Sequence, residues 1–134
     1  MDSRGRAAFA ILIGAQAAHS IEEYAFRLYD IFTPARVVSS VFSGNLAIGF
    51  AIANAGIVLF GLWCYVARVR PSHPSDRTFA WFWVALELAN GVGHTMLAAL
   101  AGGYFPGLGT APILIGVSLY LGRRLLRRTS AFAL

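Results

Sequence analysis

The chain has 134 residues, of which 57% are hydrophobic and 13% are charged. Soluble domains carry about 25% charged residues, so this composition, with a mean hydropathy of +0.64, excludes an ordinary soluble domain and indicates a membrane domain. The net charge is +5, and all eleven basic residues are arginines. Because most of them lie beside apolar runs, as membrane-flanking anchors do, we expect membrane lipids and not nucleic acid as partners.

Four apolar segments predict an all-α membrane protein, a bundle of four transmembrane helices in one domain over residues 1–134. Each segment is near the ~20 residues that a helix needs to cross the hydrocarbon layer, and strand-like alternation is absent. A polar, proline-rich loop at 68–77 and an uncharged turn at 102–107 separate the later segments. The expected spans are residues 7–32, 37–67, 78–100 and 108–126.

The positions of the arginines predict the orientation of the bundle. Nine of the eleven precede the first span, follow the last or lie between the second and third, and only Arg27 and Arg36 lie at the opposite ends. The positive-inside rule then places both termini in the cytoplasm, and we expect a bacterial cytoplasmic (inner) membrane. An alternative is a signal peptide cleaved after Ala17, which would leave three spans.

Two of the apolar segments carry polar residues that lipid does not readily accept. Each ionisable group deep in hydrocarbon costs roughly 2.5–3.5 kcal/mol, so such residues normally face a bundle interior and serve a function. Helical spacing places each set on one face, and a rise of ~1.5 Å per residue puts both sets at one level. The two sets are His19, Glu22 and Glu23 on the first segment, and Glu87, Asn90 and His94 on the third.

Histidines and carboxylates on facing helices predict a metal site. Imidazole and carboxylate ligands together suit zinc, iron or manganese, and the carboxylates would neutralise a divalent ion. We expect the metal ligands to be His19, Glu22, Glu23, Glu87 and His94. The expected catalytic residues are Glu22, Glu23, Glu87 and Asn90, with one carboxylate serving as general base and Asn90 orienting a ligand or the substrate.

A metal site within hydrocarbon predicts a membrane-embedded, metal-dependent hydrolase or oxidoreductase that acts on an apolar, lipid-like substrate. Three alternatives stay open: a metal-free acid/base isomerase or cyclase, a non-enzymatic protein, and polar pairs that only lock helices together. The non-enzymatic protein would be a metal or proton carrier or a small subunit of a larger complex. One polar layer plus Asn54 favours a closed site over a continuous pathway. Association into an oligomer or larger complex also stays open.

Three sequence elements occur in a fixed order along the chain. Residues 19–23 read His-Ser-Ile-Glu-Glu, residues 90–94 contain an Asn-x-x-x-His element, and residues 104–110 read Tyr-Phe-Pro-Gly-Leu-Gly-Thr. Together they resemble the HXXEE family, small bacterial membrane proteins named for the first motif and largely uncharacterised. The resemblance covers most of the chain. It implies that one site contains His19, Glu22, Glu23, Asn90 and His94, and it names no substrate.

Overall fold

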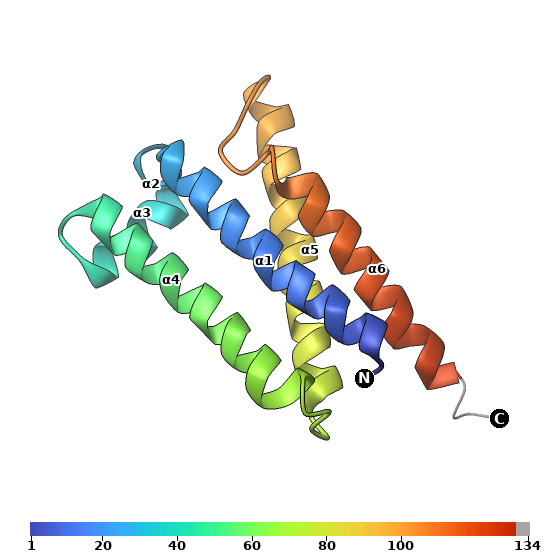
Figure 1. The fold of residues 1–134 in the computed structure, drawn as a ribbon. Helices are drawn as coiled ribbons and strands as arrows, with labels where there is room; N and C mark the ends of the chain where they lie inside the picture. Colours follow the sequence, from blue (N-terminus) through green and yellow to red (C-terminus); the bar gives the residue numbers. More distant parts are fainter. Residues whose placement is uncertain (131–134) are drawn as a thin grey trace.

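The computed structural model describes residues 1–130, with side chains to Arg127, and all of its regular secondary structure is helical. This confirms the predicted all-α class. The helices are α1 (Ser3–Ala25), α2 (Leu28–Ile31), α3 (Thr33–Phe42), α4 (Leu46–Cys64), a π-helical turn η1 (Tyr65–Val69), α5 (Asp76–Ala101) and α6 (Ala111–Ser130). Helices α1 and α5 run in one direction and α4 and α6 in the other, so the start of α1 and the C-terminal part of α6 lie at the same end of the bundle as the α4–α5 turn (Figure 1).

The first apolar segment forms a shorter helix than expected. Helix α1 ends at Ala25 and not at residue 32, because Arg27 adopts a left-handed backbone conformation with φ of 56°. Its guanidinium Nε donates to Asp30 Oδ2 at 2.6 Å, which holds the bend on the exposed surface. The chain after Arg27 turns aside from the axis of α1 and forms α2 (Figure 1).

The second apolar segment, expected as one span over 37–67, is divided into α3 and α4. The break lies at residues 43–45, where Asn45 caps α4: its Oδ1 accepts from the backbone N–H groups of Ala47 and Ile48, at 3.0 and 3.2 Å. Such side-chain caps satisfy the unpaired N–H groups of a helix start. Helix α3 therefore folds back on α4 as a hairpin at the end of the bundle away from the termini (Figure 1).

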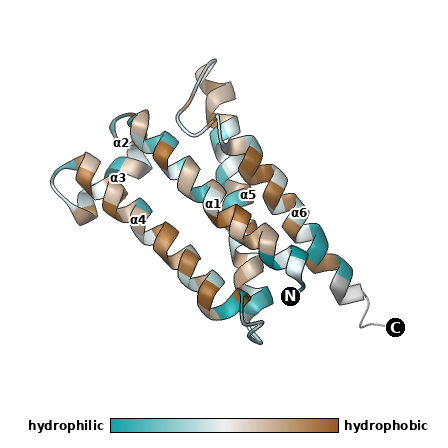
Figure 2. Cartoon of the chain, viewed as in Figure 1, coloured by the Kyte–Doolittle hydropathy of each residue, from teal (hydrophilic) through white to brown (hydrophobic). Residues whose placement is uncertain are grey.

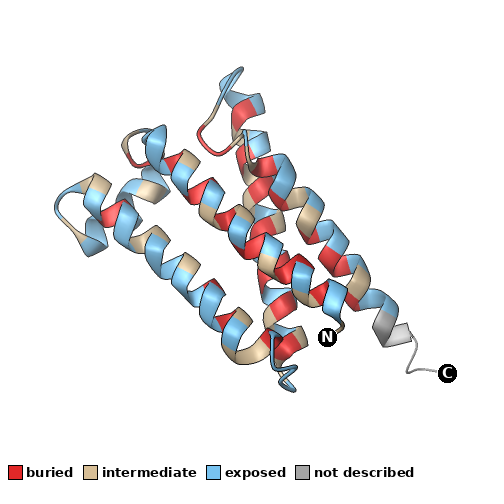
Figure 3. Cartoon of the chain, in the orientation of Figure 1, coloured by how far each residue is buried: buried red, intermediate tan, exposed pale blue. Residues whose placement is uncertain are grey.

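Two helices of the described chain are long and apolar enough to cross a membrane, Leu46–Val69 and Asp76–Ala101. Most residues of α4 are hydrophobic (Figure 2), and most of them are exposed (Figure 3). Large hydrophobic residues such as Leu59 and Leu100 are 64% and 82% exposed. Extensive exposed apolar surface marks an interaction with a membrane or a partner.

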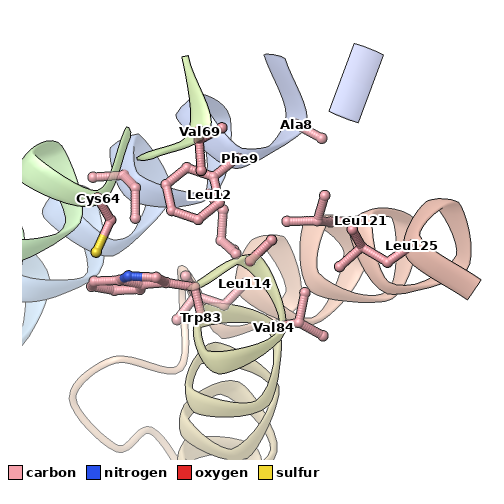
Figure 4. Close-up of a cluster of buried hydrophobic side chains, with 12 residues drawn as sticks. Ala8, Phe9, Leu12, Cys64, Val69, Trp83, Val84, Leu114, Leu121 and Leu125 are labelled. Atoms are coloured by element: carbon pink, nitrogen blue, oxygen red, sulfur yellow. The ribbon is translucent and has the colours of Figure 1, made fainter. Parts of the chain in front are cut away.

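A core near the termini fixes three of the long helices against one another. Phe9 of α1, Trp83 of α5 and Leu114 and Leu121 of α6 are each fully buried and belong to one cluster (Figure 4). The rings of Phe9 and Trp83 meet edge to face, with centroids 6.5 Å apart. This packing sets the relative positions of α1 and α5, which carry the predicted site residues.

The α3–α4 hairpin is held by a close approach of its two backbones. Gly49 of α4 is buried against Ser39 of α3, and a Cβ atom at Gly49 would overlap the Ser39 carbonyl. Beside this contact, Leu28, Tyr29 and Phe50 form a second buried apolar cluster. Helices α2 and α3 are thereby fixed as a wall beside the polar faces of α1 and α5.

Candidate metal centre

Two histidines and one glutamate converge in the interior of the bundle. His19 and Glu23 lie one turn apart on α1, and His94 projects from α5. Glu23 Oε1 lies 3.4 Å from His19 Nε2 and 3.0 Å from His94 Nε2. One ligand atom from each of the three lies within 4.8 Å of the others, and all three residues are buried. We call these residues the ligand triad.

The orientation of His94 is set by the loop between α5 and α6. Its Nδ1 lies 2.6 Å from the Pro106 carbonyl oxygen. Because a carbonyl only accepts hydrogen bonds, Nδ1 carries the proton and donates it. In the neutral ring, Nε2 is then left with its lone pair, directed at Glu23.

The orientation of His19 is set by the same loop through Thr110. The Thr110 hydroxyl donates to Glu22 Oε2 at 2.6 Å, and its oxygen lies 2.7 Å from His19 Nδ1. Since that hydroxyl hydrogen is used, Nδ1 is the donor to Thr110. His19 Nε2 is buried and has no hydrogen-bond partner within the described part of the chain. Metal-binding histidines carry this arrangement, with the second ring nitrogen donating to a fixed acceptor.

Glu22 anchors the α5–α6 loop and does not point into the triad. Its Oε1 accepts from Tyr104 Oη at 2.5 Å and from Gly109 N at 2.8 Å. Its Oε2 accepts from the backbone N–H of Thr110 at 2.8 Å, besides the hydroxyl of that residue. Desolvation and the hydrogen bond to Glu22 raise the pKa of Tyr104 from 10.0 to about 12. The two adjacent glutamates of the motif therefore have different environments.

Gly107 lets the loop lie directly against both imidazoles. A Cβ atom there would come within 2.6 Å of His94 Nδ1 and 2.7 Å of His19 Cε1. Its φ of 95° is also one that residues with a side chain rarely adopt. Position 107, where the loop backbone packs against the two histidine rings, must therefore be glycine.

Glu87 lies apart from the triad, on the same face of α5. It is fully buried and is not among the three residues whose ligand atoms converge. With the Gln16 amide oriented so that donors meet acceptors, its nitrogen lies 2.7 and 3.2 Å from the Glu87 carboxylate oxygens. Asn90, one turn further along α5, is half-buried.

A cavity of about 390 Å³ adjoins the triad and extends between α1, α3, α4 and α5. Its polar lining comprises Gln16, Glu23, Asn54, Glu87, Asn90 and His94. The remainder is apolar and includes Val38, Phe50, Ile57 and Leu86. Glu87 and Asn90 thus belong to the wall of this cavity, beside the triad.

The structure thus brings His19, Glu23 and His94 together, and puts Glu22 at the loop and Glu87 and Asn90 in the cavity wall. Reasoning from the single sequence did not assign the roles of Pro106, Gly107 and Thr110. Their signal was the element at residues 104–110, which follows the two histidine motifs in the chain. A backbone carbonyl such as that of Pro106 has no sequence signature of its own, so only its neighbours mark it.

Comparison with known proteins identifies one family. Residues 10–121 match the family model described as "Protein of unknown function with HXXEE motif". A search of curated proteins found no match, and neither did a search of solved structures. The matched range contains His19, Glu22 and Glu23 and ends within α6, so the chain belongs to the HXXEE family.

Proposed function

We propose that this protein is a membrane-embedded, metal-dependent enzyme that acts on a lipid-like substrate. The observation that carries this proposal is the ligand triad: two imidazole Nε2 atoms and a carboxylate meet in a buried position, and both Nδ1 atoms are already committed to acceptors. Two histidines and one carboxylate are a recurring ligand set of catalytic zinc and of non-haem iron. The ligand set of the proposal is therefore His19, Glu23 and His94.

We further propose that α1, α4, α5 and α6 all span a bacterial cytoplasmic membrane, with both termini on its cytoplasmic side. Support comes from the arginines, several of which lie where the start of α1 and the C-terminal part of α6 contact the α4–α5 turn. There Arg6 donates to Ser72 Oγ at 3.0 Å, and Arg77 donates to the Leu125 carbonyl at 2.6 Å. The triad lies towards the other end of the bundle, and its cavity lies beside the apolar outer surface of α4.

Each polar group beside the cavity has a distinct part in the proposed chemistry. A divalent ion bound at the triad would activate water or dioxygen. His19 and His94 would bind it as neutral rings, and Glu23 would offset part of its charge. Glu87 faces the cavity and would accept a proton from the substrate or from water, with Asn90 orienting the reacting group. Both hydrolysis and oxidation are compatible with these roles.

The test is metal content, measured by inductively coupled plasma mass spectrometry on protein purified without chelators. We expect near-stoichiometric zinc, iron or manganese in the wild type and its loss in Glu23→Gln, which keeps the shape of the side chain. His73→Ala is the matched control, since His73 is exposed in the α4–α5 turn. Glu87→Gln should also keep the metal. Full metal content in Glu23→Gln and in His19→Ala would contradict the ligand assignment.

A second candidate function is metal-free acid/base catalysis, such as isomerisation or cyclisation. One distance favours it: His94 Nε2 lies 3.0 Å from Glu23 Oε1, which is a hydrogen-bond length. A protonated His94 and Glu23 would then form a proton-transfer pair. A folded wild-type protein without metal, which also fails to take up added zinc, iron or manganese, would favour this candidate over the first.

A further inference from the structure

The charge of the cavity restricts the ligand that fits it. Two of its lining residues are the carboxylic acids Glu23 and Glu87, and none of the described residues that line it is an arginine. His94 also lines it and would bind the ion as a neutral ring. Arg36 of α3 is exposed and lines a separate surface depression. A divalent ion at the triad would be balanced by the two carboxylates. No positive charge would then be left for an anionic head group.

Anionic head groups are therefore disfavoured. Phosphates and carboxylates are normally bound by arginine, lysine or the N-terminus of a helix. A buried anion beside carboxylates keeps the cost of its desolvation without an opposite charge to offset it. Lipid phosphates, diphosphates and free fatty acids all fall in this excluded class.

The polar groups that line the cavity match a hydroxyl. The amides of Asn54 and Asn90 combine donor and acceptor atoms, and the carboxylate of Glu87 accepts hydrogen bonds when ionised. Asn54 is held in place because its Oδ1 accepts from Ser20 Oγ at 2.7 Å and its Nδ2 donates to the Phe50 carbonyl at 3.1 Å. A hydroxyl both donates and accepts, so it satisfies a mixed set of this kind without carrying charge.

The apolar lining and the size of the cavity describe the rest of the ligand. At about 30 Å³ for each water-sized group, the cavity of about 390 Å³ holds roughly a dozen non-hydrogen atoms. Val38, Ile57 and Leu86 line it and are themselves 40–49% exposed. They mark an apolar mouth on the outer surface of the bundle, through which a chain can enter from lipid.

We propose that the cavity binds an uncharged amphiphile with a hydroxyl head group, an aliphatic or isoprenoid alcohol of about decyl length, with the hydroxyl among Asn54, Glu87 and Asn90. This assignment rests on the proposed function in one respect only: the alcohol is taken to be the substrate of the proposed enzyme. Binding itself depends on the cavity and is measured separately from the metal.

The test is a competition assay on the purified protein in phosphatidylcholine nanodiscs, with tritiated decanol as the probe and protein-free nanodiscs as the partition blank. Unlabelled decanol, decanoate, decyl phosphate and decane compete. Because like-charge contacts cost several kcal/mol, we expect decanol to displace the probe at concentrations at least about tenfold below those of decanoate and decyl phosphate. Decane, which lacks the hydroxyl, should also be weaker. Equal displacement by either anion, or no saturable decanol binding, would overturn the assignment.

A pair of matched variants locates the binding site. Ala89→Trp places a bulky ring in the lining of the cavity, whereas Ala85→Trp lies one turn earlier on α5, exposed and outside the lining. Only Ala89→Trp should lose decanol binding, and equal binding by both variants would contradict the location.

Metal content separates the two proposals. Selective decanol binding by a protein without metal would support the alcohol as the ligand of the cavity and contradict the proposed metalloenzyme. Stoichiometric metal with unselective binding would do the reverse.

Discussion

At the scale of single residues, the two glutamates of the HXXEE motif divide two tasks between them. Glu23 faces both imidazoles, whereas Glu22 accepts four hydrogen bonds from Tyr104, Gly109 and Thr110. The spacing of the motif explains this division. Glu23 lies one helical turn after His19 and therefore on the same face of α1, whereas Glu22 lies further around the helix and points towards the α5–α6 loop.

Thr110 is expected to set the metal affinity without binding metal itself. In Thr110→Val the Nδ1–H of His19 loses its acceptor, and losses of this kind typically weaken a metal site 10–100-fold. Thr110→Ser keeps the hydroxyl and should keep the affinity. Titration of the metal-free protein with cobalt(II), followed by its visible absorbance, measures both. An unchanged spectrum and affinity in the valine variant would show that Thr110 does not orient His19.

Tyr104 should ionise at unusually high pH. Desolvation and the hydrogen bond to Glu22 raise the pKa of Tyr104 from 10.0 to about 12, so its stabilising contribution is complete below pH 10 and is lost as pH rises through about 12. The difference between the ultraviolet titrations of wild type and Tyr104→Phe isolates this residue from the other four tyrosines. In Glu22→Gln the pKa of Tyr104 should fall towards 10.0, and in Glu23→Gln it should stay near 12.

At the scale of elements, the α3–α4 hairpin forms one wall of the cavity, so its packing should matter for stability. Gly49→Ala forces a methyl group into the Ser39 carbonyl, and overpacking of this kind costs about 1–3 kcal/mol. Gly56→Ala is the control, because it lies on the same helix and nothing lies within 4 Å of its added methyl group. Thermal unfolding in detergent should show a lower midpoint for Gly49→Ala only. Equal midpoints would mean that the hairpin adjusts freely.

The sequence predicted the helical class, because helical periodicity follows from residue type. It also predicted a ligand set of His19, Glu22, Glu23, Glu87 and His94, of which the structure brings His19, Glu23 and His94 together. It did not predict the division of residues 37–67, where the apolar character continues and only the cap at Asn45 marks the new helix. Nor did it separate Glu22 from Glu23, since both carboxylates share the ligand chemistry. Their separation depends on the hydrogen bonds of the α5–α6 loop, which are long-range contacts.

At the scale of the whole molecule, the predicted orientation places the two ends of the chain and the α4–α5 turn in the cytoplasm. A fluorescent protein fused after Leu134 should therefore fluoresce, whereas alkaline phosphatase fused there should be inactive. Phosphatase inserted at the exposed Gly44, in the turn between α3 and α4, should be active. That turn lies at the opposite end of the bundle (Figure 1). The reverse pattern, or activity of the phosphatase at both positions, would contradict the four-span orientation.

The α5–α6 loop also sets the order in which the site is completed during synthesis. All three members of the triad are present once α5 has emerged, yet the acceptors that orient both rings, the Pro106 carbonyl and the Thr110 hydroxyl, come later in the chain. The nascent protein therefore has unoriented ligands until α6 packs against α5 and α1. In the proposed metal centre, competence to hold an ion would thus arise only with α6, after both helices that carry the ligands have been made.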